Sequence, residues 1–234
     1  MCGSSAVHGC HLVLKSIPVL YPGRASLRRS RRCAVRCYHS HVTSPQKSSL
    51  PSGLRTVFLD RDGILNEKMP EGQYVTRWED FHVLPGVPEA LRKLKDAGLR
   101  VVVVSNQRGI ARGFFLASDL DGIHNAFERL LGRAGAHIDA FFVCPHDHGQ
   151  CNCRKPLPGL FEQAVAKFPD ITAATSVMIG DSLSDIEFGR NLGMKTIYID
   201  GDPERDRRGA DEAGELTDLR FGSLAEAVEA LLGQ

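Results

Sequence analysis

Short apolar runs alternate with amphipathic stretches from residue 54 to the end of the chain. Five short, mainly apolar runs predict strands, at residues 55–59, 99–104, 138–143, 176–179 and 195–199, and the continuous apolar run in the second predicts burial on both faces. Between and after them, apolar residues recur at helical spacing, at 87–97, 118–131, 158–168, 186–192 and 224–232. This alternation predicts an α/β fold, in which helices sandwich a Rossmann-like parallel sheet with right-handed crossovers.

Local signals suggest where the first helices begin and end. Pro88 lies early in the first helical stretch and Gly98 follows it, as is usual for a helix start and stop. Ser118 and Asp121 have the spacing of a capping box at the start of the second. Residues 63–81 contain Pro and Gly and are predicted to form a loop that folds over a pocket.

Residues 1–53 are predicted to be a disordered basic leader ahead of a single domain at 54–234. The first 50 residues hold eight Lys or Arg and no Asp or Glu, and they show no sustained periodicity. Three origins fit this composition: an organellar transit peptide, a disordered tail, or upstream sequence translated from a misassigned start codon. The protein is therefore expected in the cytoplasm, or in an organelle if the leader is a transit peptide.

The net charge and the hydropathy of the chain argue against two classes of partner. Outside the leader the chain has 21 basic and 28 acidic residues, a balance of −7, which argues against a nucleic-acid-binding surface. No apolar run approaches the roughly 18 residues that a membrane helix needs. We therefore expect a monomer that binds a small molecule, with no nucleic-acid or membrane partner.

Polar side chains follow three of the predicted strands. Asp60 and Asp62 come directly after the first strand, Ser105 follows the second, and Asp181 follows the fourth, with Asp185 four residues on. Because parallel strands end at one edge of the sheet, these groups should meet there. Converging carboxylates repel each other unless a hard cation lies among them, and oxygen ligands favour Mg²⁺.

Lys155 adds an ammonium group to this set. A carboxylate nucleophile, a hydroxyl, an ammonium and Mg²⁺ together suit phosphoryl transfer, in which charge neutralisation and positioning supply most of the catalysis. Lys155 alone would be a surface charge, and an isolated Asp-x-Asp is commonly a solvated turn. The position of Asp60 and Asp62 after a buried strand and before Gly63 favours the catalytic interpretation, as does the place of Lys155 in the CRKP run.

Three cysteines and a histidine just before Lys155 predict a metal-binding loop. Structural zinc prefers four ligands of the cysteine and histidine types, which are supplied here by Cys144, His146, Cys151 and Cys153. His148 is an alternative ligand. Four protein ligands leave no open position, so the zinc is expected to fix the loop and not to take part in chemistry. A reduced cysteine cluster without metal is the other interpretation.

Four motifs in order resemble those of the haloacid dehalogenase-like phosphatases. They are DRDGILN at 60–66, SNQRGIARG at 105–113, CRKPLPG at 153–159 and GDSLSD at 180–185. The chain is most similar to the zinc-loop group that contains the D-glycero-D-manno-heptose 1,7-bisphosphate phosphatases, over about residues 54–232. No segment between the motifs is long enough for a large cap domain, so residues 63–81 and the zinc loop are expected to form the pocket walls.

This resemblance implies a role for each motif residue. Asp60 would be the nucleophile that forms an aspartyl-phosphate, and Asp62 would protonate the leaving sugar oxygen and then activate water. Ser105 and Lys155 would hold the transferred phosphoryl group, and Asp185 would orient the site. Asp60, the Asp62 carbonyl and Asp181 would bind Mg²⁺, and the rest of the substrate would contact Asn106, Gln107 and Arg154.

The expected reaction is hydrolysis of the C7 phosphate of D-glycero-D-manno-heptose 1,7-bisphosphate. Histidinol phosphate or another small sugar phosphate is the alternative substrate, because histidinol-phosphate phosphatases share the DRDG motif and the zinc loop. GIARG and the Pro-x-Pro-Gly after Lys155 favour the sugar enzyme. Ser182 departs from relatives that have Lys there, which removes one substrate contact. A zinc-stabilised binding module without activity is a third hypothesis, and the complete catalytic set argues against it.

Overall fold

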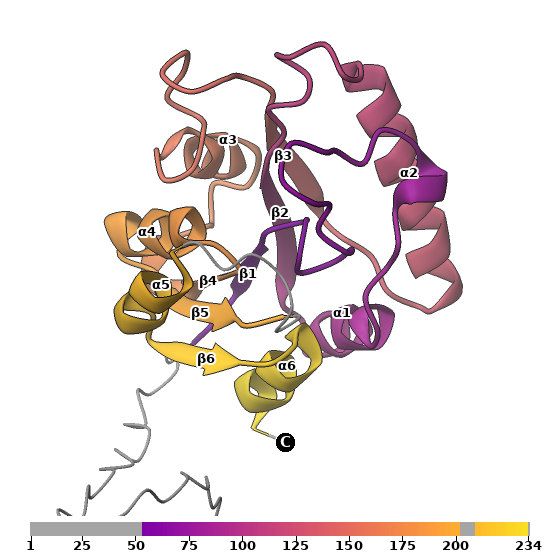
Figure 1. The fold of residues 1–234 in the computed structure, drawn as a ribbon. Coiled ribbons are helices and arrows are strands. Elements are labelled where there is room, and N and C mark those ends of the chain that lie inside the picture. Colours follow the sequence, from indigo (N-terminus) through magenta and orange to yellow (C-terminus); the bar gives the residue numbers. More distant parts are fainter. Residues whose placement is uncertain (1–52, 202–208, 234) are drawn as a thin grey trace, which may run out of the picture. The chain divides into compact units, whose positions relative to one another are not determined.

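A six-stranded parallel sheet forms the centre of the protein (Figure 1). The structure is a computed structural model that describes residues 53–201 and 209–233, so the predicted leader lies, apart from Gly53, outside the described residues. The strand order is β3-β2-β1-β4-β5-β6. The strands are β1 (Thr56–Leu59), β2 (Arg100–Asn106), β3 (Ala140–Cys144), β4 (Ser176–Gly180), β5 (Lys195–Ile199) and β6 (Leu219–Phe221).

The first strand lies in the middle of the sheet, which places the first acidic motif between two others. Leu59, the last residue of β1, pairs with Val103 of β2 on one side and Ile179 of β4 on the other. All four residues of β1 are buried, as expected of a strand covered on both faces. The segments that follow β1, β2 and β4 therefore emerge side by side at the carboxyl edge of the sheet.

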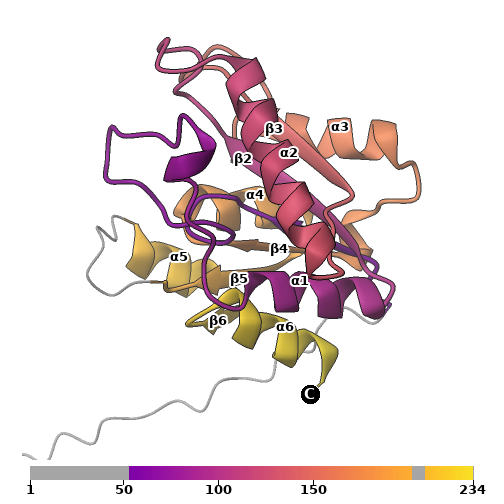
Figure 2. The same cartoon turned by 90° about the vertical axis from the view of Figure 1, so that its right-hand side faces the viewer.

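Helices cover both faces of the sheet, as the alternating pattern predicts (Figures 1 and 2). Apolar residues of α1, α2 and α6 pack with Val57, Val101 and Val177 on one face. Residues of α3 and α4 pack with Phe58, Val102 and Met178 on the other, and α5 packs beside α4. The helices are α1 (Val87–Asp96), α2 (Ala117–Arg133), α3 (Gly159–Lys167), α4 (Leu183–Leu192), α5 (Ala210–Leu216) and α6 (Leu224–Leu232).

Two helix starts differ from the predictions. The capping box predicted from Ser118 and Asp121 is wrong: α2 begins at Ala117, and the Asp119 carboxylate accepts a hydrogen bond from the backbone N–H of Leu116 at 2.8 Å. The fourth helix begins at Leu183, three residues before the predicted start. Asp185 accepts a hydrogen bond from the backbone N–H of Ser182, which satisfies an N-terminal donor and extends the helix toward the site.

The sheet also contains a strand that the hydropathy pattern did not predict. β6 has only three residues, and its middle residue, Arg220, is exposed, so no apolar run marks it. The preceding helix α5 is also short, and its three acidic residues leave no clear apolar pattern in the sequence. The third strand begins at Ala140, two residues later than predicted, because the backbone N–H of Ile138 bonds instead to the Glu128 carboxylate.

The predicted loop at 63–81 leaves the sheet and returns through local contacts. Asn66 forms isolated bridges with Asp62 and Val83, and a short 3₁₀ helix, η1 (Trp78–Asp80), lies beside α2 (Figure 1). Residues 67–73 between these contacts are mostly exposed. None of the helices in the part of the chain that the structure describes is both long enough and apolar enough to span a membrane.

Candidate active site

Three carboxylates from two strand ends meet at the carboxyl edge of the sheet. Asp60 follows β1, and Asp181 and Asp185 follow β4, and their nearest oxygens all lie within 4.8 Å of one another. The turn after Asp60 needs a glycine at position 63, because its φ is +94° and an added Cβ would lie 2.2 Å from the Asp181 carboxylate. The predicted meeting of Asp60 and Asp181 is therefore confirmed by the geometry.

Lys155 lies buried among these carboxylates. Its ammonium nitrogen Nζ is 2.8 Å from Asp60 Oδ1 and 2.6 Å from Asp185 Oδ1, and it donates to the carbonyl of Val104 at 2.6 Å. Burial alone would lower the pKa of Lys155, but the charges of Asp185 and Asp60 raise it overall. Lys155 is therefore a cation held by two hydrogen bonds and by an ion pair with Asp185.

One ammonium does not neutralise the whole acidic cluster. Burial raises the pKa of Asp60 to about 7, and the charges of Asp185 and Asp181 add to this effect while Lys155 opposes it. Burial also raises the pKa of Asp181. Asp181 Oδ1 is buried without a hydrogen-bond partner. A hard divalent cation fits this site, because it would satisfy that oxygen and favour the ionised form of each carboxylate.

Asp62 is held by a different set of donors. Its Oδ1 accepts hydrogen bonds from Arg61 Nη2 at 2.7 Å and Asn66 Nδ2 at 3.0 Å, and its Oδ2 accepts one from Gln107 Nε2 at 2.8 Å. Burial would raise the pKa of Asp62, but the Arg61 charge and these hydrogen bonds lower it overall. Asp62 is therefore ionised at neutral pH, whereas burial disfavours the ionised form of Asp60.

Arg61 was not singled out from the sequence, although it stands between the two motif aspartates. Its side chain is only 1% exposed, and its guanidinium lies over the Phe81 ring at 5.8 Å. An arginine between two predicted catalytic acids in a buried strand-end motif is the signal that could have identified it. Lys68, which pairs with Asp181 at 2.7 Å, was also missed, because nothing in the sequence links the loop to the fourth motif.

The polar residues at the end of β2 line the pocket and also hold other site residues in place. Ser105 is 1% exposed, and its Oγ accepts a hydrogen bond from Gln107 Nε2 at 2.8 Å. Asn106 holds the backbone of Lys155: its Oδ1 accepts from Lys155 N at 3.0 Å, and its Nδ2 donates to Lys155 O at 3.2 Å. These amides therefore position Asp62, Ser105 and Lys155 as well as lining the pocket.

A pocket of about 360 Å³ lies over this edge of the sheet, within the size range of small-molecule sites. Residues 68–75 and the pair Arg154–Lys155 line it, so both predicted walls contribute. Arg154 Nη1 is buried without a hydrogen-bond partner, as suits a group that receives an anion. The other predicted site residues that line the pocket are Asp60, Asp62, Ser105, Asn106 and Gln107.

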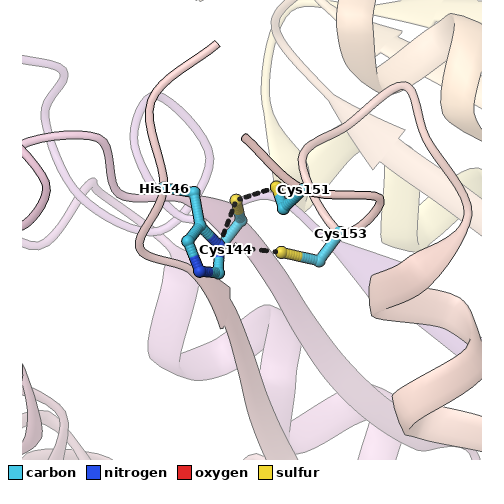
Figure 3. A group of neighbouring side chains, drawn as sticks. All are labelled: Cys144, His146, Cys151 and Cys153. Atoms are coloured by element: carbon cyan, nitrogen blue, oxygen red, sulfur yellow. Dashed lines mark hydrogen bonds between the residues drawn. The ribbon is translucent and has the colours of Figure 1, made fainter. Parts of the chain in front are cut away.

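The four predicted zinc ligands converge at the end of β3 (Figure 3). The Cys144 and Cys151 sulfurs are 3.5 Å apart, and His146 Nδ1 is 3.4 Å from the Cys153 sulfur and 3.9 Å from that of Cys144. Tetrahedral zinc with sulfur at about 2.3 Å places its ligand atoms about 3.5 to 3.8 Å apart, so this group fits the metal. His148 is not part of the group.

The metal-binding loop is connected to Gln107 in the second motif and to Lys155 in the third. The carbonyl of Cys144 accepts a hydrogen bond from the backbone N–H of Gln107 at 2.8 Å. Gly159 lets the chain close after Lys155, because its N–H donates to the Asn152 carbonyl and an added Cβ would lie 2.8 Å from that oxygen. The loop therefore sets the position of Gln107 as well as that of Lys155.

Comparison with known proteins identifies the family. A family model described as haloacid dehalogenase-like hydrolase matches residues 43–193, more than half of the chain. The chain belongs to the haloacid dehalogenase-like hydrolases. In this chain, the first, second and fourth motifs lie at the ends of β1, β2 and β4, and the third follows β3.

Relatives of known name in this hydrolase family cover most of the domain. D-glycero-alpha-D-manno-heptose-1,7-bisphosphate 7-phosphatase of Mycobacterium tuberculosis is 39% identical over 171 residues, 73% of this chain and 87% of the relative. D-glycero-beta-D-manno-heptose-1,7-bisphosphate 7-phosphatase of Haemophilus ducreyi is 40% identical over 155 residues, 63% of this chain and 83% of the relative.

A solved structure supports the same assignment of fold. The D,D-heptose 1.7-bisphosphate phosphatase from B. bronchiseptica, crystallised with magnesium and phosphate, superimposes with a TM-score of 0.69 at 32% identity. The match covers 77% of this chain and 99% of that structure. The predicted fold, a helix-covered parallel sheet of the haloacid dehalogenase type, is confirmed.

Proposed function

We propose that the protein is a magnesium-dependent phosphatase that hydrolyses the C7 phosphate of D-glycero-D-manno-heptose 1,7-bisphosphate. The observation that carries the proposal is the meeting of Asp60, Asp181 and Lys155 at one sheet edge, beneath a pocket that also presents Arg154. The two heptose-bisphosphatase relatives, at 39% and 40% identity, support the choice of substrate.

Asp60, the backbone carbonyl of Asp62, and Asp181 are the groups that would hold Mg²⁺. The ion would neutralise the oxygens of the transferred phosphate and keep Asp60 ionised, which its raised pKa otherwise opposes. The Lys155 ammonium already touches Asp60 and would contact the same phosphate. Ser105 would hold that phosphate through its hydroxyl.

In the first step, an oxygen of Asp60 forms a bond to phosphorus while the bond from phosphorus to the C7 oxygen breaks. The leaving oxygen takes a proton from Asp62, which first takes up that proton from solvent when the phosphate charge approaches and raises its low pKa. In the second step, Asp62 takes a proton from water, whose oxygen attacks phosphorus and releases Asp60. The products are heptose 1-phosphate and inorganic phosphate.

Asn106, Gln107 and Arg154 would bind the rest of the substrate, and Asp185 would orient Lys155 through the contact of 2.6 Å. Zinc bound by Cys144, His146, Cys151 and Cys153 would hold the loop that presents Arg154 and Lys155. All these groups belong to one chain, which supports a monomer as the working form.

Phosphate release by the purified full-length protein tests this function. With Mg²⁺, the α and β anomers of heptose 1,7-bisphosphate should be hydrolysed faster than histidinol phosphate, and ³¹P NMR should show that the C1 phosphate remains. Asp60→Asn, which keeps the size of the side chain, should reduce the rate at least about 1,000-fold without changing the unfolding temperature.

Two results would change the assignment. Equal or faster release from histidinol phosphate would make the protein a histidinol-phosphate phosphatase and reverse the ranking of substrates. Hydrolysis that persists in the Asp60→Asn protein would reject Asp60 as the nucleophile, and no hydrolysis of any sugar phosphate by the native protein would support a binding module.

A further inference from the structure

Lys68 extends from the exposed part of the 63–81 loop to the acidic cluster. Its ammonium nitrogen lies 2.7 Å from Asp181 Oδ2, and its side chain is 43% exposed. The residue also lines the pocket. Since its stem is flexible and its head is accessible to solvent, this ammonium can move within the pocket by rotating its side chain alone.

A divalent cation at Asp181 would weaken its pairing with Lys68, because Lys68 holds Oδ2 and the cation would take Oδ1, which has no hydrogen-bond partner. Asp181 belongs to the group of carboxylates whose oxygens lie within 4.8 Å of one another, and it is a proposed Mg²⁺ ligand. A divalent cation on Oδ1 would neutralise Asp181 and repel the ammonium on Oδ2. The Lys68 ammonium would then be released from Asp181 while it remains inside the pocket.

The charges of most other cations of the pocket are already balanced. Lys155 makes three short contacts with oxygens. The charge of the buried Arg61 is paired with Asp62, although its Nη1 has no hydrogen-bond partner. Arg108 faces Asp147 at 3.6 Å. Arg154, with a buried unpaired nitrogen, is available to an anion. A bisphosphate would bring a second dianion into this pocket, and one arginine leaves half of its charge uncompensated.

We propose that Lys68 is a specificity-determining residue that binds the non-transferred phosphate of a sugar bisphosphate once a divalent cation has taken Asp181 from it. The inference rests on the proposed function, because it assigns the second phosphate of the same substrate. Lys68 thus pairs with the Asp181 carboxylate before the metal binds, and it binds the second phosphate of the substrate afterwards.

The test compares Lys68→Met with the native full-length protein on two matched substrates, heptose 1,7-bisphosphate and heptose 7-phosphate, which lacks the second phosphate. The ratio of kcat/KM for the bisphosphate to that for the monophosphate should fall about tenfold, mainly through KM, as expected for a half-exposed charged contact. Lys68→Arg should retain the ratio. Lys95→Met, which removes an exposed lysine outside the pocket, should leave both values unchanged.

A measurement without turnover tests the exchange of partners. In calorimetric titrations with MgCl₂ and no substrate, Lys68→Met should bind Mg²⁺ several-fold more tightly than the native protein, because no ammonium on Asp181 repels the ion. Equal or weaker Mg²⁺ binding would overturn the exchange.

The outcomes separate the two proposals. If the native protein hydrolyses the bisphosphate and Lys68→Met keeps the native substrate ratio, the inference about Lys68 is overturned and the proposed function stands. If the native protein hydrolyses neither sugar phosphate, the proposed function fails and the inference falls with it.

Discussion

The stability of the protein should fall in mild acid because of one buried histidine near Arg61 and Asp62. His124 on α2 is 7% exposed and stacks on Phe141 with a centroid distance of 4.2 Å. Burial, together with the nearby charge of Arg61, lowers its pKa from 6.5 to about 3. Protonation would place a second positive charge beside the guanidinium that holds Asp62.

The sign and size of the effect follow from proton linkage. Because the folded-state pKa is lowered, the contribution of His124 is complete above about pH 6.5 and is lost progressively as the pH falls toward 3. At pH 5 the unfolded histidine is protonated and the folded one is not. The loss at that pH is about 2 kcal/mol relative to pH 7.5.

Urea unfolding at pH 7.5 and pH 5.0 measures this loss when the native protein is compared with His124→Phe. The phenylalanine keeps the ring stack on Phe141 but carries no proton, so the variant should lose about 2 kcal/mol less stability over this interval. Other titrating groups cancel in the difference. His82→Phe, which replaces an exposed histidine, is the control and should show the native pH dependence. Identical losses in the native protein and His124→Phe would refute the reasoning.

Three further predictions address the site. Cys151→Ser removes one of four converging ligands, so zinc content and activity should fall together in metal analysis and phosphate-release assays; a zinc-free protein with full activity would contradict the structural role. Arg61→Met removes the charge that lowers the pKa of Asp62, so the acidic limb of the kcat/KM profile should move to higher pH; an unchanged limb would exclude this electrostatic role. Gln107→Leu removes the donor shared by Asp62 and Ser105 and should lower kcat about 10- to 100-fold in steady-state assays, whereas Gln163→Leu on the exposed face of α3 should have no effect.

The central strands could be predicted because burial on both faces requires continuous apolar runs. The fifth strand and the last helix have the predicted bounds, 195–199 and 224–232. β6 and α5 could not be predicted in this way, since an edge strand of three residues needs no apolar run and carries the exposed Arg220. Helix starts also depended on which carboxylate reached a backbone N–H, as Asp119 and Asp185 illustrate.

The candidate site could be predicted to the level of its motifs but not of its contacts. Asp60, Asp181 and Lys155 were expected at one edge because parallel strands share a carboxyl end, and they meet there. Two of these contacts depend on how loops fold over the sheet. They are the hydrogen bonds between Asn106 and the Lys155 backbone and the pairing of Lys68 with Asp181. Loop conformations of this kind leave no periodic pattern in a sequence.

The hydrogen bond from Gln107 N–H to the Cys144 carbonyl joins the predicted zinc-binding residues to the glutamine that holds Asp62. The same glutamine holds Asp62, whereas Asp60 is anchored by β1 and by Lys155. Because the loop also presents Lys155, loss of zinc in a starved cell would, under the proposed function, loosen the contacts of both aspartates. Such starvation should then slow both the departure of the sugar and the hydrolysis of the phosphorylated enzyme.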